Sequence, residues 1–155
     1  MVKNLKTDQL ATYVIENTST VFTVDVEESF SSRGVHIPQG DYHYYLKEIN
    51  GEKQKYNLYL SPTHKGESSL LLGQILIRDE KFVARSILPL GNKKELALCV
   101  LNDNQGVLNQ YVSVYGECTC TLCHRKLKKM ASIRRGMGPC CYDRYLESIS
   151  PSLMM

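Results

Sequence analysis

Hydrophobic and polar residues alternate in several stretches of the first 116 residues, and this pattern predicts a small sheet. Residues 21–27 alternate Phe and Val with Thr, Asp and Glu, which is the period-two pattern of a half-buried strand. Two further apolar runs, 70–77 and 81–88, are separated by a short acidic turn and are expected to pair antiparallel. With the hairpin described next, these runs predict about five strands.

The strongest local signal is the dipeptide Asn50-Gly51, which lies between two runs rich in tyrosine. A two-residue type I′ turn needs positive φ at both positions and this dipeptide tolerates it, so an antiparallel hairpin is expected over residues 41–60. That turn pairs residues whose numbers sum to 101, so Tyr45 would face Tyr56. One face of the hairpin would then carry Tyr42, Tyr44, Leu46, Lys53, Lys55 and Tyr59.

Apolar positions recur at helical spacing in three other stretches. Residues 5–16 predict a short helix, and Asn92, with Glu95 three positions later, is typical of the start of a second. A third short helix is expected from about residue 104 to 115, whereas residues 29–40 hold two glycines and a proline and are expected to form a loop. The chain is therefore predicted to be an α+β protein, with a small antiparallel sheet and short helices.

The composition fits one ordinary domain, or one small domain with a compact appendage. The chain has 155 residues, of which 43% are apolar and 23% charged, so it can bury a core. No apolar run approaches the roughly eighteen residues that a membrane span needs, and we expect no membrane partner. The first residues lack the apolar stretch of a secretory signal, so the expected location is a reducing cytoplasm. Six cysteines in such a compartment need a reason other than disulfides.

The basic residues are concentrated near the C-terminus. The formal net charge of the chain is +3, but residues 118–147 carry seven basic against two acidic residues, a net +5, and the remainder is −2. A concentrated cationic segment is typical of contact with phosphates, although solvated basic loops have the same composition. The basic residues are Arg125, Lys126, Lys128, Lys129, Arg134, Arg135 and Arg144.

Five of the six cysteines lie in this C-terminal segment, and their spacing is typical of a structural zinc site. Cys120 and Cys123 have the C-x-x-C spacing of a zinc knuckle, and a second pair, Cys140 and Cys141, follows about sixteen residues later. Pro139 at a first helical position would place the second pair in the first turn of a terminal helix, where the helix dipole favours a thiolate.

Helical spacing separates the two adjacent cysteines. Cys141 falls on the apolar stripe of the terminal helix and Cys140 on its charged side, so Cys141 is expected to point inward. The predicted Zn²⁺ ligands are Cys118, Cys120, Cys123 and Cys141, with Cys140 or His124 as substitutes for Cys118. An iron–sulfur cluster, a disulfide and a redox pair are the alternatives. Cys99 stands apart in an apolar stretch and is expected to be an inert buried thiol.

The same segment contains a longer motif of twelve residues: Tyr115, Gly116, Cys120, Cys123, Arg125, Leu127, Ser132, Ile133, Gly136, Gly138, Pro139 and Cys141. It resembles a small module of unknown function that is frequent in bacteriophage and actinobacterial proteins. The chain departs from that pattern at His124, where the module usually has glycine, and Cys118 and Cys140 are additional. The resemblance implies a β-rich segment with two short helices upstream, and an accessory protein of phage or mobile-element origin.

A tetrahedral site with four protein ligands leaves no position for water, so the expected role of the metal is structural. We expect it to hold residues 117–150, as a zinc-binding knuckle and terminal helix, on an α+β body of residues 1–116. The favoured function is nucleic-acid binding, with stacking on the tyrosine face of the hairpin and phosphate contacts from Arg125, Lys126, Lys128, Lys129, Arg134 and Arg135. The alternative is a protein-binding adaptor or an inhibitor of host machinery, for example an anti-defence protein.

Nothing in the sequence predicts catalysis. His36, His43, His64 and Asp41 do not fall at a spacing that a metal site or a base and nucleophile pair requires. The chain has no P-loop, dinucleotide-binding fingerprint or nucleophile elbow. We therefore expect no enzyme and no catalytic residue, and a partner that is either nucleic acid or a host protein.

Overall fold

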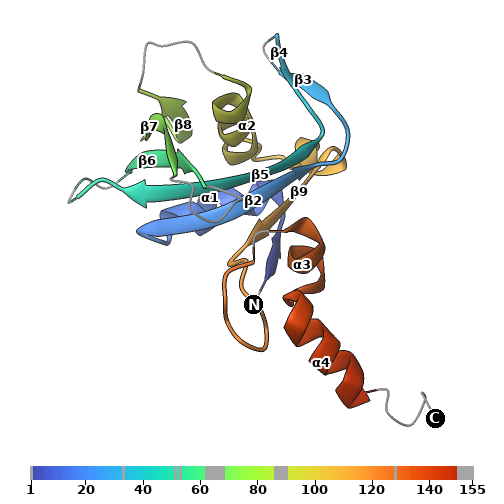
Figure 1. Ribbon diagram of the computed structural model, residues 1–155. Coiled ribbons are helices and arrows are strands. Elements are labelled where there is room, and N and C mark those ends of the chain that lie inside the picture. Colours follow the sequence, from blue (N-terminus) through green and yellow to red (C-terminus); the bar gives the residue numbers. More distant parts are fainter. Residues whose placement is uncertain are drawn as a thin grey trace.

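The computed structural model contains a seven-stranded antiparallel sheet and describes residues 2–32, 34–50, 52, 54–61, 69–85, 91–127 and 129–149 (Figure 1). The strands lie in the order β1-β9-β2-β5-β6-β7-β8. Their bounds are β1 Lys3–Leu5, β2 Ser19–Val26, β5 Gly40–Glu48, β6 Lys55–Leu60, β7 Leu70–Arg78, β8 Lys81–Ala84 and β9 Val112–Gly116. A separate two-stranded sheet is formed by β3 Phe30–Ser32 and β4 Val35–Ile37. The predicted α+β class is confirmed.

Two helices cover one face of the large sheet, and the main core lies beneath them. The helices α1 (Thr7–Ile15) and α2 (Asn92–Leu101) pack against each other, α1 against β2 and α2 against β8. The rings of Phe22 and Tyr44 lie 5.3 Å apart in this core, and the Tyr44 hydroxyl donates a hydrogen bond to the carbonyl oxygen of Lys93 on α2. None of the helices among the described residues is long and apolar enough to cross a membrane.

The interior strand β2 is covered on both faces. Phe22 and Val24 point into the main core, whereas Thr23 and Asp25 point to the opposite face and are also buried. Their cover comes from the chain after β9, which folds back as α3 (Met130–Arg135) and continues into α4 (Pro139–Ile149). The alternation predicted for this strand is present, but it separates two buried surfaces instead of one buried surface and solvent.

The C-terminal segment has a small apolar cluster of its own. Cys118, Cys120, Leu127 and Ile133 are buried together, apart from the main core. The helix α4 extends away from the sheet and has no buried residue (Figure 1). The division into a body of residues 1–116 and a module of residues 117–150 stays a prediction.

The predicted hairpin forms from β5 and β6, but its predicted register is wrong. Tyr45 pairs with Tyr59, so paired numbers sum to 104 and not to 101. The chain does not reverse in a two-residue turn at Asn50: the Ile49 N–H donates to the Lys55 carbonyl oxygen at 2.9 Å, which closes a longer loop. Gln54 supplies a positive φ of 67° in that loop. The three-residue difference is odd, and an odd shift exchanges the faces of one strand relative to the other.

The predicted tyrosine face is therefore wrong as well. Tyr44 is completely buried in the main core, while Tyr45 and Tyr59 lie together on the opposite face with ring centroids 5.7 Å apart. Tyr42 is half-buried, and its hydroxyl donates to the carbonyl oxygen of Pro38. No single face gathers the three tyrosines that were expected to stack on bases.

Two of the predicted helices and the second predicted pair of strands are present in the structure. The helix predicted over 5–16 and the helix starting at Asn92 are confirmed as α1 and α2, although Gly91, and not Asn92, occupies the cap position of α2. The runs at 70–77 and 81–88 form β7 and β8, joined by Asp79 and Glu80 in left-handed backbone conformations. Residues 86–88 lie outside the described residues.

Two predictions of local structure are wrong. The helix expected over 104–115 is replaced by a short 3-10 helix, Val107–Gln110, and by the strand β9. In β9 the β-branched residues Val112 and Val114 are buried and alternate with half-buried neighbours, so period two prevails over the helical spacing. The loop expected over 29–40 contains β3 and β4, with Gly34 between them at a φ of 78°.

Candidate metal centre

Three cysteine side chains converge between the start of the C-terminal segment and the start of α4. The sulfur atoms of Cys120, Cys123 and Cys141 all lie within 4.8 Å of one another. Cys120 is completely buried, Cys141 is half-buried and Cys123 is exposed, so the group opens to solvent on one side. Three cysteine sulfurs, once deprotonated, form a soft donor set, which suits a thiophilic metal ion.

A tight hairpin positions the first two cysteines. Thr119 and Lys126 form a β-bridge, and on either side of it the N–H of Cys120 donates to Arg125 and the N–H of Leu127 donates to Cys118, both at 2.8 Å. The N–H of His124 donates to the Cys120 carbonyl oxygen at 2.9 Å and closes the loop. This loop brings the sulfurs of a C-x-x-C pair onto the same side.

His124 has a left-handed backbone, with a φ of 61°. A side chain in this conformation costs roughly 1–2 kcal/mol, and glycine avoids most of that cost. The resemblance described above predicts glycine at this position, and the left-handed backbone is a conformation that glycine adopts readily. The imidazole of His124 is exposed and lies outside the group of three sulfurs.

Two short helices bring Cys141 to the hairpin. The helix α3 ends at Gly136, whose left-handed φ of 76° turns the chain toward Pro139, and the first hydrogen bond of α4 runs from the N–H of Tyr142 to the Gly138 carbonyl oxygen. The N–H and the hydroxyl of Thr121 both donate to the Gly136 carbonyl oxygen, at 2.9 Å and 3.0 Å. The turn between the helices is thus fixed to the C-x-x-C loop.

The electrostatics of the group favour a thiolate at its buried member. Backbone N–H groups of Cys123 and Gly138 lower the pKa of Cys120 to about 6. Hydrogen bonds with Cys123 and Cys120 raise the pKa of Cys141 to about 11, because its proton is shared with its neighbours. N–H donors aimed at sulfur stabilise thiolate ligands of a metal in the same way.

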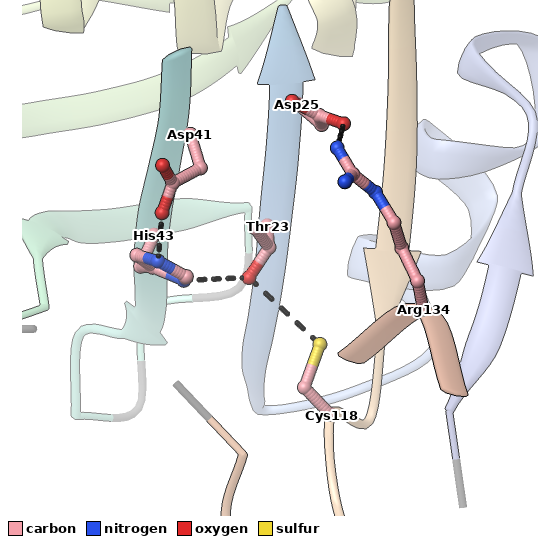
Figure 2. A network of polar contacts seen from close by, with 6 residues as sticks. All are labelled: Thr23, Asp25, Asp41, His43, Cys118 and Arg134. Atoms are coloured by element: carbon pink, nitrogen blue, oxygen red, sulfur yellow. Dashed lines mark hydrogen bonds and ion pairs between the residues drawn. The ribbon is translucent and has the colours of Figure 1, made fainter. Parts of the chain in front are cut away.

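Cys118 lies outside this group and takes part in a different network, which Figure 2 shows. Its sulfur lies 3.8 Å from the Thr23 hydroxyl on β2 and 3.6 Å from the Tyr115 carbonyl oxygen. The Thr23 hydroxyl lies 2.9 Å from Nδ1 of His43, and Nε2 of His43 lies 2.9 Å from the Asp41 carboxylate. Burial raises the pKa of Cys118, which favours the thiol form. The chain Asp41–His43–Thr23–Cys118 therefore joins the C-terminal segment to the sheet.

A second polar contact joins the same two parts of the chain. The Arg134 guanidinium on α3 donates to the Asp25 carboxylate on β2 (Figure 2). Asp25 raises the pKa of Arg134, mainly through this hydrogen bond. Arg134 was predicted to contact phosphate, and in the structure it anchors α3 to the sheet while 56% of its side chain stays exposed.

The remaining cysteines and the basic side chains lie outside the group of three sulfurs. Cys140 is exposed on the first turn of α4, and Cys99 is half-buried on α2, where its sulfur contacts Glu95. The guanidinium of Arg135 lies 4.5 Å from the centre of the Tyr142 ring. Arg125, Lys126 and Lys129 are exposed, and Lys128 lies outside the described residues.

The polar residues of the network were not predicted from the sequence. The signal was present in β2, where Thr23 and Asp25 fall on the face opposite Phe22 and Val24. Such residues on an amphipathic strand are normally exposed to solvent. Alternation alone therefore did not show that this face of β2 is buried against the C-terminal segment.

A family model described as "Family of unknown function (DUF6011)" matches residues 113–146. The matched range contains the three converging cysteines, α3 and all but the last turn of α4. No curated protein and no solved structure matches the chain.

Proposed function

We propose that this protein is a small zinc-binding accessory protein, of the kind found in phages, that binds nucleic acid through its basic C-terminal segment. The observation that supports the proposal is the exposed cationic side chains on the hairpin and helix that carry the cysteine group. The rest of the chain carries a formal net charge of −2, so the excess of basic over acidic residues lies in this segment.

Zinc fits the donor set because three thiolates and one further ligand form its usual structural site. Cys120, Cys123 and Cys141 would hold the ion, and the fourth ligand is Cys140 or His124, since both are exposed within the same segment. Cys118 is engaged by Thr23 and Tyr115. Zinc bound by such a set cross-links the chain and leaves phosphate binding to the basic side chains.

Arg125, Lys126 and Lys129 are the most available cations, because each is exposed and none forms an ion pair among the described residues. Arg134 and Arg135 are held by Asp25 and Tyr142, so they contribute charge from fixed positions. Lysine and arginine on a preorganised surface bind phosphate without sequence preference, and each contact releases a counterion.

The proposal is tested by fluorescence anisotropy with labelled DNA and RNA over a range of salt concentrations. Each phosphate contact contributes about 0.9 to the slope of log K against log salt on duplex DNA, so a variant with Arg125→Ala and Lys129→Ala should flatten the slope by about 2. The matched control is Lys47→Ala with Lys81→Ala, which removes two exposed lysines from the sheet. Equal slopes for the two double variants would contradict the proposal.

A second function, protein binding, is favoured by one specific observation. Tyr145, Leu146 and Ile149 on α4 are 41%, 38% and 52% exposed and form an uncovered apolar stripe. Such a stripe is typical of a helix that binds a partner protein. Recovery of one defined protein after nuclease treatment, lost in Leu146→Asp, would favour this function over nucleic-acid binding.

A further inference from the structure

A pocket of about 590 Å³ lies where the C-terminal segment meets the sheet. One wall is formed by residues of the C-x-x-C hairpin and its approach, among them Cys118 and Lys126. The opposite wall is formed by β2 and β5, with Val21, His43 and Tyr45 on it. The size is within the range of pockets that bind small organic ligands.

Several residues that line this pocket carry groups that both donate and accept hydrogen bonds. The residues that line it include Asn17 with its amide, His43 with its imidazole and, besides Thr20, five serine and threonine residues. These five are Ser19, Thr23, Ser61, Ser69 and Thr119. The network of Figure 2 borders this pocket, because Thr23, His43 and Cys118 all line it.

The lining also indicates the chemistry of the ligand. Tyr45, supported by Tyr59 at 5.7 Å, offers an aromatic ring, and Lys126 offers the positive charge of the basic segment. An aromatic surface combined with many donor–acceptor groups suits a planar heterocycle with alternating donors and acceptors, and such rings stack on tyrosine. A purely anionic ligand would need more than the one cation that Lys126 supplies.

We propose that this pocket binds the base of one unpaired nucleotide, with Lys126 contacting its phosphate. The inference rests on the proposed nucleic-acid function and adds a preference for single strands to it. A base in a duplex is stacked and paired, so it reaches such a pocket only after it leaves the helix. Binding through the phosphates alone would make no such distinction.

The first experiment uses nuclear magnetic resonance of the ¹⁵N-labelled full chain with AMP, GMP, CMP and UMP, and inorganic phosphate as the control for the anion alone. We expect nucleotides, but not phosphate, to shift the amide signals of residues 19–23 and 43–45. The variant Val21→Phe places a ring in the pocket and should abolish these shifts. The matched control Val83→Phe alters a half-buried valine of β8, which does not line the pocket, and should preserve them.

Single-stranded and duplex oligonucleotides separate this proposal from the broader one. A preference for single strands that Val21→Phe removes, while salt-dependent duplex binding persists, supports the pocket. Equal binding of both forms, with no shifts from any mononucleotide, overturns the pocket and leaves the phosphate-binding function standing. Mononucleotide shifts without binding of any oligonucleotide would support the pocket and overturn the nucleic-acid function.

Discussion

Removal of the metal is expected to unfold the C-terminal segment and to leave the sheet intact. The perturbation is treatment with a strong zinc chelator under reducing conditions or, in a genetic form, the variant Cys123→Ser. Cys123 is exposed, so serine removes a thiolate without opening a cavity in the apolar cluster. Cys99→Ser is the matched control, since Cys99 lies on α2 away from the three converging sulfurs.

The magnitude follows from how little apolar surface the segment buries. Leu127 and Ile133 are its two buried aliphatic side chains among the described residues, and each contributes about 1.5–3 kcal/mol. A structural zinc site contributes about 10–16 kcal/mol. A bound metal would therefore stabilise residues 118–149 more than their apolar burial does, whereas the sheet and its helices have nineteen buried apolar residues of their own in the described part of the chain.

Hydrogen–deuterium exchange measured by mass spectrometry checks this prediction. Amides of residues 118–149 should lose protection in the chelated protein and in Cys123→Ser, while those of β2, β5 and α2 keep it. Cys99→Ser should behave as the wild type. If native mass spectrometry finds no metal, or if protection of the segment survives the chelator, the reasoning from the three sulfurs is refuted.

Three further predictions concern single side chains around the site. Arg134→Ala should lower the free energy of unfolding by about 1 kcal/mol or less, because the ion pair with Asp25 is partly exposed, and a double-mutant cycle with Asp25→Asn measured by urea unfolding should assign that loss to the pair. His124→Gly should raise the free energy of unfolding by up to about 1 kcal/mol, because glycine relieves the left-handed backbone; a fall in zinc content measured by elemental analysis would instead identify His124 as the fourth ligand. Cys118→Ala should retain one metal ion per chain by native mass spectrometry, since its sulfur faces Thr23, and loss of the ion would return Cys118 to the ligand set.

The sequence predicted elements with strong periodicity and failed where two periods competed. The strand β2 alternates with period two and α1 has apolar residues at helical spacing, but residues 104–115 place apolar side chains at both helical and strand spacing. Pairing with β1 and β2 settles this ambiguity in favour of β9, and such pairing is a long-range property that local spacing does not contain.

The register of the hairpin was predicted wrongly for a different reason. Asn50-Gly51 is a correct turn signal, yet the reversal uses a longer loop, and Tyr44 and Leu58 enter the core as a consequence. The choice is settled by burial: the observed register places Tyr44, Leu46, Tyr56 and Leu58 on the same buried face. The predicted register divided these side chains between the two faces.

The cysteine group was the most predictable part of the site. Helical spacing alone distinguished Cys141 from Cys140, and the structure brings Cys141, and not Cys140, to the C-x-x-C pair. The position of Cys118 could not be predicted, because it depends on a hydroxyl ninety-five residues earlier in the chain.

The segment matched by the family model begins inside β9, and β9 lies in the sheet between β1 and β2. The segment that carries the cysteine group is therefore not joined to the sheet by a flexible linker, because its first strand is part of the sheet. Residues 113–146 would fold in another protein only if that protein has room for a strand between two of its own strands. One of those strands would also need a hydrogen-bond acceptor and a carboxylate two positions apart, as Thr23 and Asp25 are on β2. A fusion of this segment to a terminus or loop of another protein would include the cysteines but lose the contacts with the sheet that hold them in place.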